Sequence, residues 1–233
     1  MLIRSAGNER GESGDGTFPP DGPFDTMTGE AIAKNILTVG NVNPTTDLPE
    51  NGNDFELSGS SSWGPSDDGR IKPDLVAPGV QLLSTDHEEI GGYGTKSGTS
   101  MSPPVTAGNS LLLQQYYHQL FGDYMKSATL KGLLLHTTLS GGIAPGPDYR
   151  YGYGFLDADL AARTISEVGF SEIKELALAE GAGYQLEFEV TDTSSPLIVS
   201  ISWTDPEGVP FENAVLNPDR LNLVNDLDLR ISD

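Results

Sequence analysis

The stretch SGTSMSPPVTAG, residues 97–108, places Ser100 among small residues just before a pair of prolines. A serine hydroxyl is a weak nucleophile until a base takes its proton and donors stabilise the oxyanion that it creates. A helix is expected to begin near Ser102–Pro104, because proline is well tolerated in a first helical turn. The Ser100 N–H then lies near the positive end of the helix dipole, where negative charge is stabilised. From these residues alone, Ser100 is either a nucleophile or a helix cap.

A nucleophilic Ser100 needs a base, and the sequence offers three histidines, His87, His118 and His136. A base must come within hydrogen-bonding distance of the hydroxyl. His118 follows Ser100 along one expected helix, and the rise of 1.5 Å per residue separates them by about 27 Å. His136 lies in an apolar helical pattern typical of a packed core residue, and His87 lies in an acidic loop typical of a solvated side chain. We therefore expect the base to come from outside this sequence.

The elements around Ser100 alternate between strands and helices. The apolar runs AKNILTVGNV (33–42) and DLVAPGV (74–80) predict buried strands ended by turn residues. The helix after Ser100 is apolar on most sides over 111–120, which predicts a buried helix. A second helix is predicted at 127–139, with Ser127 as its N-cap. This order of elements predicts an α/β fold with a parallel sheet and flanking helices.

The pattern changes after about residue 171. YQLEFEV (184–190) alternates strictly between apolar and polar residues, and LIVSISW (197–203) and LVNDLDLRI (223–231) follow with turn residues between them. Period-two alternation over several segments is typical of an antiparallel sheet with one wet face. We therefore divide the chain into an α/β domain, 1–170, and an incomplete β-sandwich, 171–233.

Composition excludes several partners and cofactors. The net charge of −21 disfavours nucleic acid and anionic membrane surfaces as partners. The absence of cysteine excludes disulfides and thiolate metal sites. No apolar run is long enough to cross a bilayer, and the opening residues lack the pattern of a signal peptide. They instead look like the middle of a domain, because Leu2 and Ile3 end a short strand-like run that leads directly into Gly7 and Asn8, so we expect that Met1 is not the natural start.

Four carboxylates in the last part of the chain are candidate calcium ligands: Asp205, Glu207, Asp226 and Asp228. Carboxylate oxygens are the ligands that calcium prefers, but the spacing is not that of an EF-hand. Strand alternation also places Asp226 and Asp228 on a wet face whatever their function. Structural calcium is thus one expectation, and a solvated acidic face is the other.

The residues around Ser100 also resemble a known family. Ser102 stands where the nucleophile elbow G-x-S-x-G has its second glycine, so that motif is not matched. Gly98–Pro104 instead resembles the serine motif of the subtilisin-like serine proteases (subtilases), G-T-S-M-(A/S)-x-P. SAGNE (5–9), SSSWGPSDDGRIKPDLVAPGV (60–80), SATLKGLLLHTT (127–138) and YGYGFLDADLAA (151–162) resemble further subtilase segments in family order. The resemblance covers residues 1 to about 165.

This resemblance implies a subtilisin-like α/β fold and a serine endopeptidase that acts on proteins or peptides without a catalytic cofactor. It implies that Ser100 is the nucleophile and that Asn8 completes the oxyanion hole. Ser5, Ala6 and Gly7 would form one wall of the substrate pocket, while Gly98 and Thr99 let a substrate backbone approach. The family's catalytic Asp and His segments lie upstream of the asparagine, so this chain alone is expected to be inactive. Enzymes of this kind are generally exported, which implies an extracellular location.

Two other functions stay open. A non-catalytic relative would keep the subtilase-like scaffold for binding, although a scaffold needs neither Ser100 nor Asn8. A serine esterase is disfavoured by the missing second glycine of the nucleophile elbow.

ISWTDPEG and LVNDLDLRI are similar to the β-sandwich that follows the catalytic domain in one branch of large bacterial subtilases. The oligomeric state is not predicted by the sequence.

Overall fold

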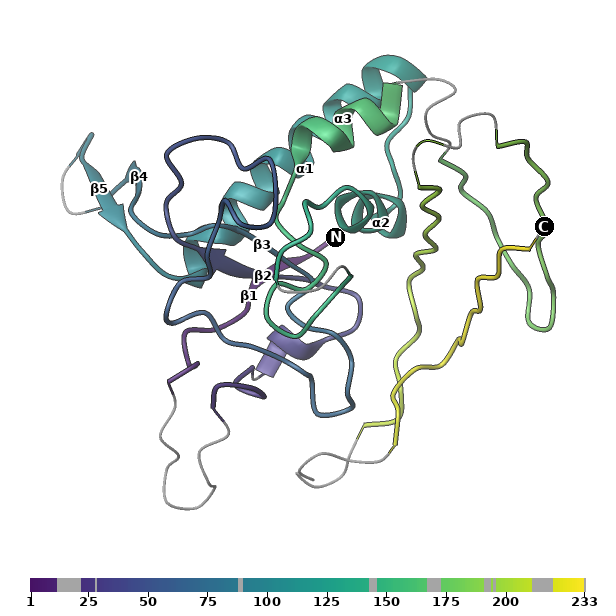
Figure 1. Ribbon diagram of the computed structural model, residues 1–233, viewed down its shortest axis with the longest axis horizontal. Helices are drawn as coiled ribbons and strands as arrows, with labels where there is room; N and C mark the ends of the chain where they lie inside the picture. Colours follow the sequence, from purple (N-terminus) through teal and green to yellow (C-terminus); the bar gives the residue numbers. More distant parts are fainter. Residues whose placement is uncertain are drawn as a thin grey trace.

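The computed structural model describes residues 1–11, 22–27, 29–87, 90–142, 146–166, 173–190, 194, 196–210 and 220–232. Three parallel strands form its central sheet in the order β1-β2-β3 (Figure 1). They are β1 (Ile3–Ser5), β2 (Leu37–Val42) and β3 (Leu75–Pro78). Ile3 pairs with Leu37, and Val39 pairs with Leu75. The two buried strands predicted from apolar runs are thus confirmed.

Helices cover one face of this sheet. They are α1 (Ser102–Phe121), α2 (Ser127–His136) and α3 (Ala158–Ser166). Alternate strand residues, Leu37, Val39, Leu75 and Ala77, pack with Leu113, Met125, Leu130, Leu133, Leu134, Leu156, Ala161 and Ile165. The intervening Val42 and Val76 pack on the opposite face with Phe55, Leu57 and Tyr151. Both faces of the sheet are therefore buried, as a parallel sheet requires.

Two smaller elements complete this part of the chain. A 3₁₀ turn, η1 (Gly29–Ile32), precedes β2. The strands β4 (Leu82–Thr85) and β5 (Tyr93–Lys96) form an antiparallel pair between β3 and Ser100. This pair projects from the body of the molecule at the left of Figure 1. Among the described residues, no helix is both long and apolar enough to cross a membrane.

Two helix predictions are wrong. Helix α1 is not buried on most sides: Leu111 and Leu112 are 71% and 64% exposed. Its buried residues are Ser102, Thr106, Ser110 and Leu113, a mainly small and polar face. The hydroxyl groups of Thr106 and Ser110 can be buried because each donates to the carbonyl four residues earlier. Lys126, not Ser127, is the N-cap residue of α2, and it makes no side-chain capping bond.

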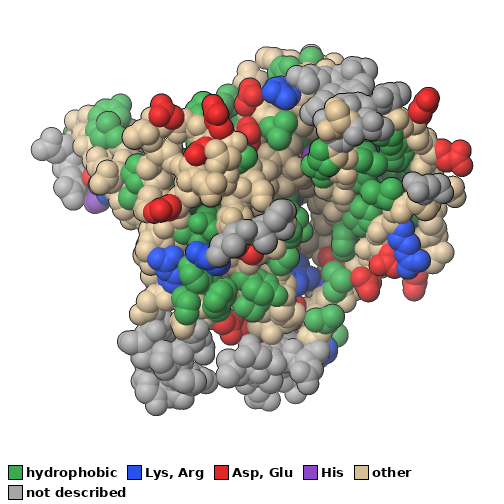
Figure 2. Space-filling view, viewed as in Figure 1, with side chains coloured by type: hydrophobic (Ala, Val, Ile, Leu, Met, Phe, Trp, Pro, Cys, Tyr) green, Lys and Arg blue, Asp and Glu red, His purple; other side chains and the backbone are tan. Residues whose placement is uncertain are grey.

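The predicted β-sandwich is not shown. The described residues from 173 onward run past α2 at the right of Figure 1 without forming a strand. Tyr184, Leu186, Phe188 and Val190, predicted to share a buried face, are each between 44% and 54% exposed. Figure 2 shows hydrophobic side chains gathered over this part of the surface. The predicted domain boundary at 170/171 lies outside the described residues.

Candidate active site

The candidate site lies at the carboxyl edge of the parallel sheet, where α/β sheets commonly bind ligands. Asn8 follows β1, Gly79 follows β3, and the turn that carries Ser100 lies against both. Gly98 N–H donates to the carbonyl of Gly79 at 2.8 Å. A side chain at Gly79 would collide with Ser102 Oγ and with Asn41. The absence of a side chain therefore lets the Ser100 turn close onto the end of β3.

Asn8 is fixed in orientation by Thr99. Asn8 Oδ1 accepts the Thr99 N–H at 2.9 Å and the Thr99 hydroxyl at 3.1 Å. Because a backbone N–H only donates, the amide oxygen must face Thr99 and the Nδ2 donor must face away. Asn8 is exposed, and Nδ2 has no hydrogen-bond partner within the described part of the chain. The arrangement leaves one oriented, accessible donor beside the Ser100 turn.

Gly7 and Ser62 hold the backbone on which Asn8 is mounted. Gly7 has φ +111°, a region that favours glycine, and a Cβ there would lie only 2.9 Å from Ser62 Oγ. Ser62 N–H donates to the Gly7 carbonyl at 2.9 Å, and Ser62 Oγ accepts the Glu9 N–H at 2.9 Å. The Thr99 hydroxyl also accepts the Gly7 N–H at 3.3 Å. Ser62 was not singled out from the sequence; the serine run before Trp63 was its only signal.

Ser100 lies in a short 3₁₀ turn, η2 (Thr99–Met101), that leads directly into α1. Gly98 precedes it with φ +137°, a conformation that L side chains rarely adopt. Behind it, the buried Ser102 hydroxyl donates to the Ala77 carbonyl of β3 at 3.1 Å. Ser100 itself is exposed, and its hydroxyl makes no hydrogen bond to any described residue. The turn is held by these backbone and side-chain contacts, while the Ser100 hydroxyl is exposed.

Each of the three histidines is occupied elsewhere. His87 Nδ1 lies 3.1 Å from Asp86 Oδ1 next to the β4–β5 pair, and the His87 side chain is 87% exposed. His118 stacks on Tyr124 with ring centroids 4.4 Å apart. His136 Nδ1 hydrogen-bonds Ser200 Oγ at 2.8 Å, and burial lowers the pKa of His136. His136 is only half-buried, at the end of α2, so its expected core position is not observed.

The remaining predicted pocket residues divide by exposure. Ser5, Gly7 and Gly98 are half-buried, whereas Ala6 and Thr99 are buried. The Thr99 side chain faces Asn8 and Gly7, so it supports the site from beneath. Substrate contact at these positions stays a prediction.

Buried charges lie at the other edge of the sheet. Lys72 Nζ lies 2.5 Å from Asp74 Oδ2 and Lys131 Nζ lies 3.0 Å from Asp74 Oδ1, just before β3 begins. Asp74 Oδ2 also accepts the Thr38 N–H at 2.7 Å. Burial lowers the pKa of Lys72 to about 8, although Asp74 opposes the shift. These charges join the starts of β2 and β3 and lie away from the edge that carries Ser100.

The predicted calcium ligands do not form one cluster. The Asp205 carboxylate is paired with Lys34. Across the described ranges, no three acidic, histidine or cysteine side chains are grouped so that they could hold a metal ion. Calcium binding stays a prediction, and these four residues are not its demonstrated ligands.

Comparison with known proteins shows the family of this chain. The model of the subtilase family, peptidase S8, matches residues 1–154. The chain therefore belongs to the subtilase family, and the resemblance noted in the sequence is confirmed. The parallel sheet with flanking helices is consistent with this family's fold.

Individual relatives are proteases. The chain is 37% identical over 116 residues to C5a peptidase of Streptococcus pyogenes, covering 50% of this chain and 9% of that protein. It is 25% identical over 195 residues to the PI-type proteinase of Lactococcus lactis subsp. cremoris, covering 69% of this chain and 10% of the relative. The chain thus spans about a tenth of the length of the curated relatives it matches.

Solved structures show the same fold. The CspB protease of Clostridium perfringens superposes with a TM-score of 0.50 at 30% identity, over 61% of this chain and 29% of that one. A lanthipeptide protease superposes with a TM-score of 0.53 at 20% identity, over 71% and 51% of the two chains, and supports the fold alone.

Proposed function

We propose that this chain carries the nucleophile and the oxyanion hole of a subtilisin-like serine endopeptidase. Ser100 attacks the carbonyl of a peptide bond, and an acyl-enzyme forms on its oxygen. Asn8 Nδ2 and the Ser100 N–H donate to the oxyanion. The observation that carries this proposal is the orientation of Asn8, whose Oδ1 is occupied by two donors of Thr99 while Nδ2 is left open.

The base and its orienting carboxylate come, in this proposal, from outside these 233 residues. All three histidines have other contacts, with Asp86, Tyr124 and Ser200. Without a base, Ser100 stays a weak nucleophile. The 233-residue chain alone is therefore expected to hydrolyse peptides negligibly, and a longer protein that supplies the base is expected to be active.

A fluorophosphonate probe tests this assignment, because it labels only an activated serine. The longer protein with its upstream sequence is expected to label quickly, and Ser100→Ala is expected to abolish labelling. Ser97→Ala is the matched control, since it removes a neighbouring exposed hydroxyl and should leave labelling intact. Fast labelling of the 233-residue chain alone would show that a base exists within it and would contradict the external base.

Two alternative functions make different predictions for the longer protein. If the protein is a non-catalytic scaffold, the probe will label neither the 233-residue chain nor a longer protein. A serine esterase would cleave a p-nitrophenyl ester but no peptide. Membership in a family of proteases, together with the open Asn8 donor, favours the peptidase.

We further infer an extracellular enzyme with protein or peptide substrates and without nucleic acid or membrane partners, in line with its net charge of −21. Residues 171–233 are proposed to contribute strands to a β-sandwich. Their alternating segments and exposed apolar residues support this. Structural calcium is also proposed; a calcium-dependent rise in the unfolding temperature would test it.

A further inference from the structure

The C-terminal part of the chain contacts the outer face of α2. One face of α2 carries residues that recur every three or four positions along the helix: Lys126, Thr129, Gly132 and His136. Glu175 Oε1 accepts the Lys126 N–H at 2.9 Å and also the Thr129 hydroxyl. Its Oε2 lies 3.1 Å from Lys126 Nζ. A carboxylate from the C-terminal part thus satisfies the start of this helix, where negative charge is favoured.

An extended stretch then runs along the same face. Ser200 hydrogen-bonds His136, and Ser202 lies against Gly132. Two extended residues span about 6.6 Å, and four helical residues rise about 6 Å. The stretch runs antiparallel to α2, because the later Ser202 meets the earlier helix residue Gly132, and the matching spacing lets both contacts form together. A Cβ added at Gly132 would lie 2.7 Å from Ser202 Cβ, so glycine allows this close approach.

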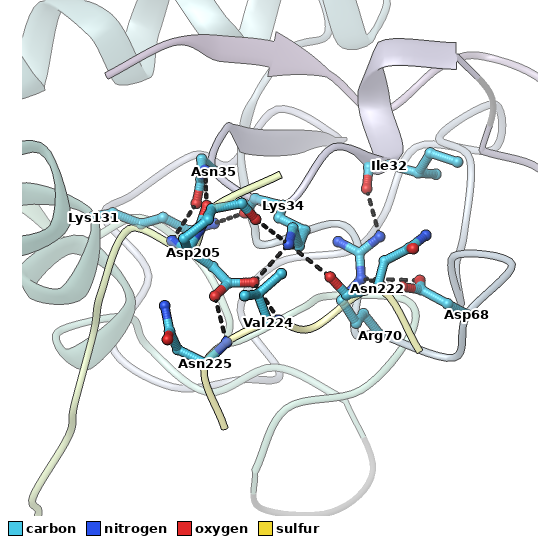
Figure 3. Close-up of polar contacts among 11 residues, drawn as sticks. Ile32, Lys34, Asn35, Asp68, Arg70, Lys131, Asp205, Asn222, Val224 and Asn225 are labelled. Carbon is cyan, nitrogen blue, oxygen red and sulfur yellow. Dashed lines mark hydrogen bonds and ion pairs between the residues drawn. The ribbon is translucent and has the colours of Figure 1, made fainter. Parts of the chain in front are cut away.

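The stretch ends at Asp205, which is paired with Lys34 ahead of β2 (Figure 3). Lys34 Nζ lies 2.5 Å from Asp205 Oδ2, 2.5 Å from the Pro206 carbonyl and 2.7 Å from the Asn222 carbonyl. An ammonium group has three donors, and here all three are used. Lys34 therefore holds two separate C-terminal segments at one point.

Asp205 is equally well satisfied. Its carboxylate accepts the backbone N–H groups of Val224 at 2.9 Å and Asn225 at 2.8 Å. Its own backbone exchanges two bonds with the Asn35 amide: Asn35 Nδ2 donates to the Asp205 carbonyl at 2.7 Å, and Asp205 N–H donates to Asn35 Oδ1 at 3.0 Å. Burial would raise the pKa of Asp205, but Lys34 and the two amides outweigh it and lower that pKa to about 2.

The point of attachment is itself braced from the core. Lys131 Nζ donates to the carbonyls of Lys34 at 3.3 Å and Ile36 at 2.9 Å, and pairs with the buried Asp74. Figure 3 shows Lys131, Lys34 and Asp205 in one polar group. The Lys34 backbone is therefore held rigidly when its side chain meets Asp205.

We propose that Lys34, Asn35 and the outer face of α2 form a docking surface whose occupant is the Ser200–Asp205 stretch of the same chain. We name it the α2 docking surface. Asp205 fixes the stretch in place, so the C-terminal part is a fixed brace of the protease domain and not a freely tethered module. This proposal does not rest on the proteolytic function, since it concerns only contacts within the chain.

Gly132→Ala in the full chain is a sharp test. Alanine favours a helix interior over glycine, so this substitution alone should stabilise α2. If the stretch is docked, the new methyl group meets Ser202 and loosens it. Cleavage within 196–210 by an added protease should then accelerate about tenfold, because a methyl group forced into a close contact destabilises the packing on that scale.

The matched control is Gly108→Ala, because Gly108 also lies within a helix but an added Cβ would meet nothing within 4 Å. It should leave cleavage within 196–210 unchanged. Ser202→Gly combined with Gly132→Ala should restore the original rate. Equal cleavage rates for Gly132→Ala and Gly108→Ala would overturn the docking surface.

Asp205→Asn tests the fixing residue, with the exposed Asp228→Asn as control. Hydrogen exchange should rise at least about tenfold in α2 and near Lys34 for Asp205→Asn only, because the substitution removes the counter-ion of the partly buried Lys34, while exchange in β2 stays slow. Slow exchange in β2 shows that the variant is still folded. Unchanged exchange in α2 would overturn the role of Asp205.

Discussion

Two contacts in this chain join residues far apart in sequence, and they differ in what they leave open. Asn8 and Thr99 are 91 residues apart and are joined by neutral hydrogen bonds. Lys34 and Asp205 are 171 residues apart and form a charged pair. The first contact leaves Asn8 Nδ2 without a partner among the described residues, whereas the second uses all three Lys34 donors.

This difference distinguishes a candidate ligand site, the Asn8–Thr99 contact, from a structural joint, the Lys34–Asp205 contact. An oriented donor costs little to hold ready and is used fully only when an oxyanion forms in the transition state. A buried charge, in contrast, is stable only when it is paired and hydrogen-bonded. Removing a group from the first contact should therefore reduce catalysis, and removing one from the second should reduce stability.

The largest expected effect on activity is at the open donor. In a protein that joins this chain to the proposed base, Asn8→Ala should lower kcat by about 10²–10³, the range for the oxyanion asparagine of subtilisin, which belongs to this family. KM should change little, because the bond strengthens only as the oxyanion forms. Steady-state kinetics on a chromogenic peptide measure both constants.

Asn109→Ala is the control for this substitution. The Asn109 amide also makes a hydrogen bond, donating to the Val105 carbonyl at 2.9 Å, but it does so along α1. This variant should keep kcat within about twofold, since one helical side-chain bond contributes modestly. A loss for Asn8→Ala that is confined to KM would contradict the oxyanion role.

The charged joint should respond in stability. Lys34→Met leaves the Asp205 carboxylate buried without its counter-ion, which is expected to cost about 3–5 kcal/mol of unfolding free energy. The chain has two tryptophans. Trp63 lies next to Ser62, near the candidate site, and Trp203 lies in the stretch that ends at Asp205. Denaturant unfolding followed by Trp203 fluorescence in a Trp63→Phe background reports on the joint itself.

Lys96→Met is the matched control, because Lys96 pairs with Asp86 at 3.1 Å but is half-exposed. Exposed pairs contribute about 0–1 kcal/mol. If both lysine variants lose the same small free energy of unfolding, the Lys34–Asp205 pair contributes no more than an ordinary surface pair. The Lys34–Asp205 contact is then not a structural joint.

More of the candidate site than of the joint could be proposed from the sequence, and the roles of Asn8 and Ser100 stay predictions. Strands β2 and β3 were visible as short apolar runs because burial on both faces of a parallel sheet demands them. The motif around Ser100 and the SAGNE segment pointed to Asn8 and Ser100 by resemblance. The Asn8–Thr99 bonds were not anticipated, because Thr99 is small and its neighbours in sequence do not indicate that it is buried.

The Lys34–Asp205 pair had no local signal. Asp205 was predicted as a possible calcium ligand, since a lone carboxylate in a turn does not show which charge it will meet. The prediction that helix α1 is buried on most sides was wrong for a related reason. Its leucines predicted burial, but the face that meets the sheet is mainly serine and threonine, whose hydroxyls are satisfied within the helix.

Acid should weaken the joint. The folded-state pKa of Asp205 is about 2, below its ordinary value of 3.8. A carboxylate with a depressed pKa contributes stability that is fully present above about pH 4 and is lost as the pH falls toward 2. The expected loss is about 2 kcal/mol, measured by the Trp203 unfolding signal between pH 5 and pH 2.

Other acids contribute in the same direction, since the pKa of Glu175 is also lowered by its bonds to Thr129 and Lys126, against the effect of burial. The difference between the unmutated chain and Asp205→Asn isolates the Asp205 share, because asparagine does not titrate. If the two proteins lose stability in parallel between pH 4 and pH 2, the charge of Asp205 does not stabilise the joint.

The smallest effect should come from the hydroxyl that supports Asn8. Thr99→Val keeps the shape of the side chain but removes one donor to Asn8 Oδ1 and the acceptor for the Gly7 N–H. The Thr99 backbone N–H still reaches Oδ1 at 2.9 Å, so Nδ2 should keep its direction. We expect a loss of about 1 kcal/mol of stability and a less than tenfold fall in kcat, with Thr99→Ser near the original values. A fall as large as that of Asn8→Ala would mean that the hydroxyl, and not the backbone N–H, orients the open donor.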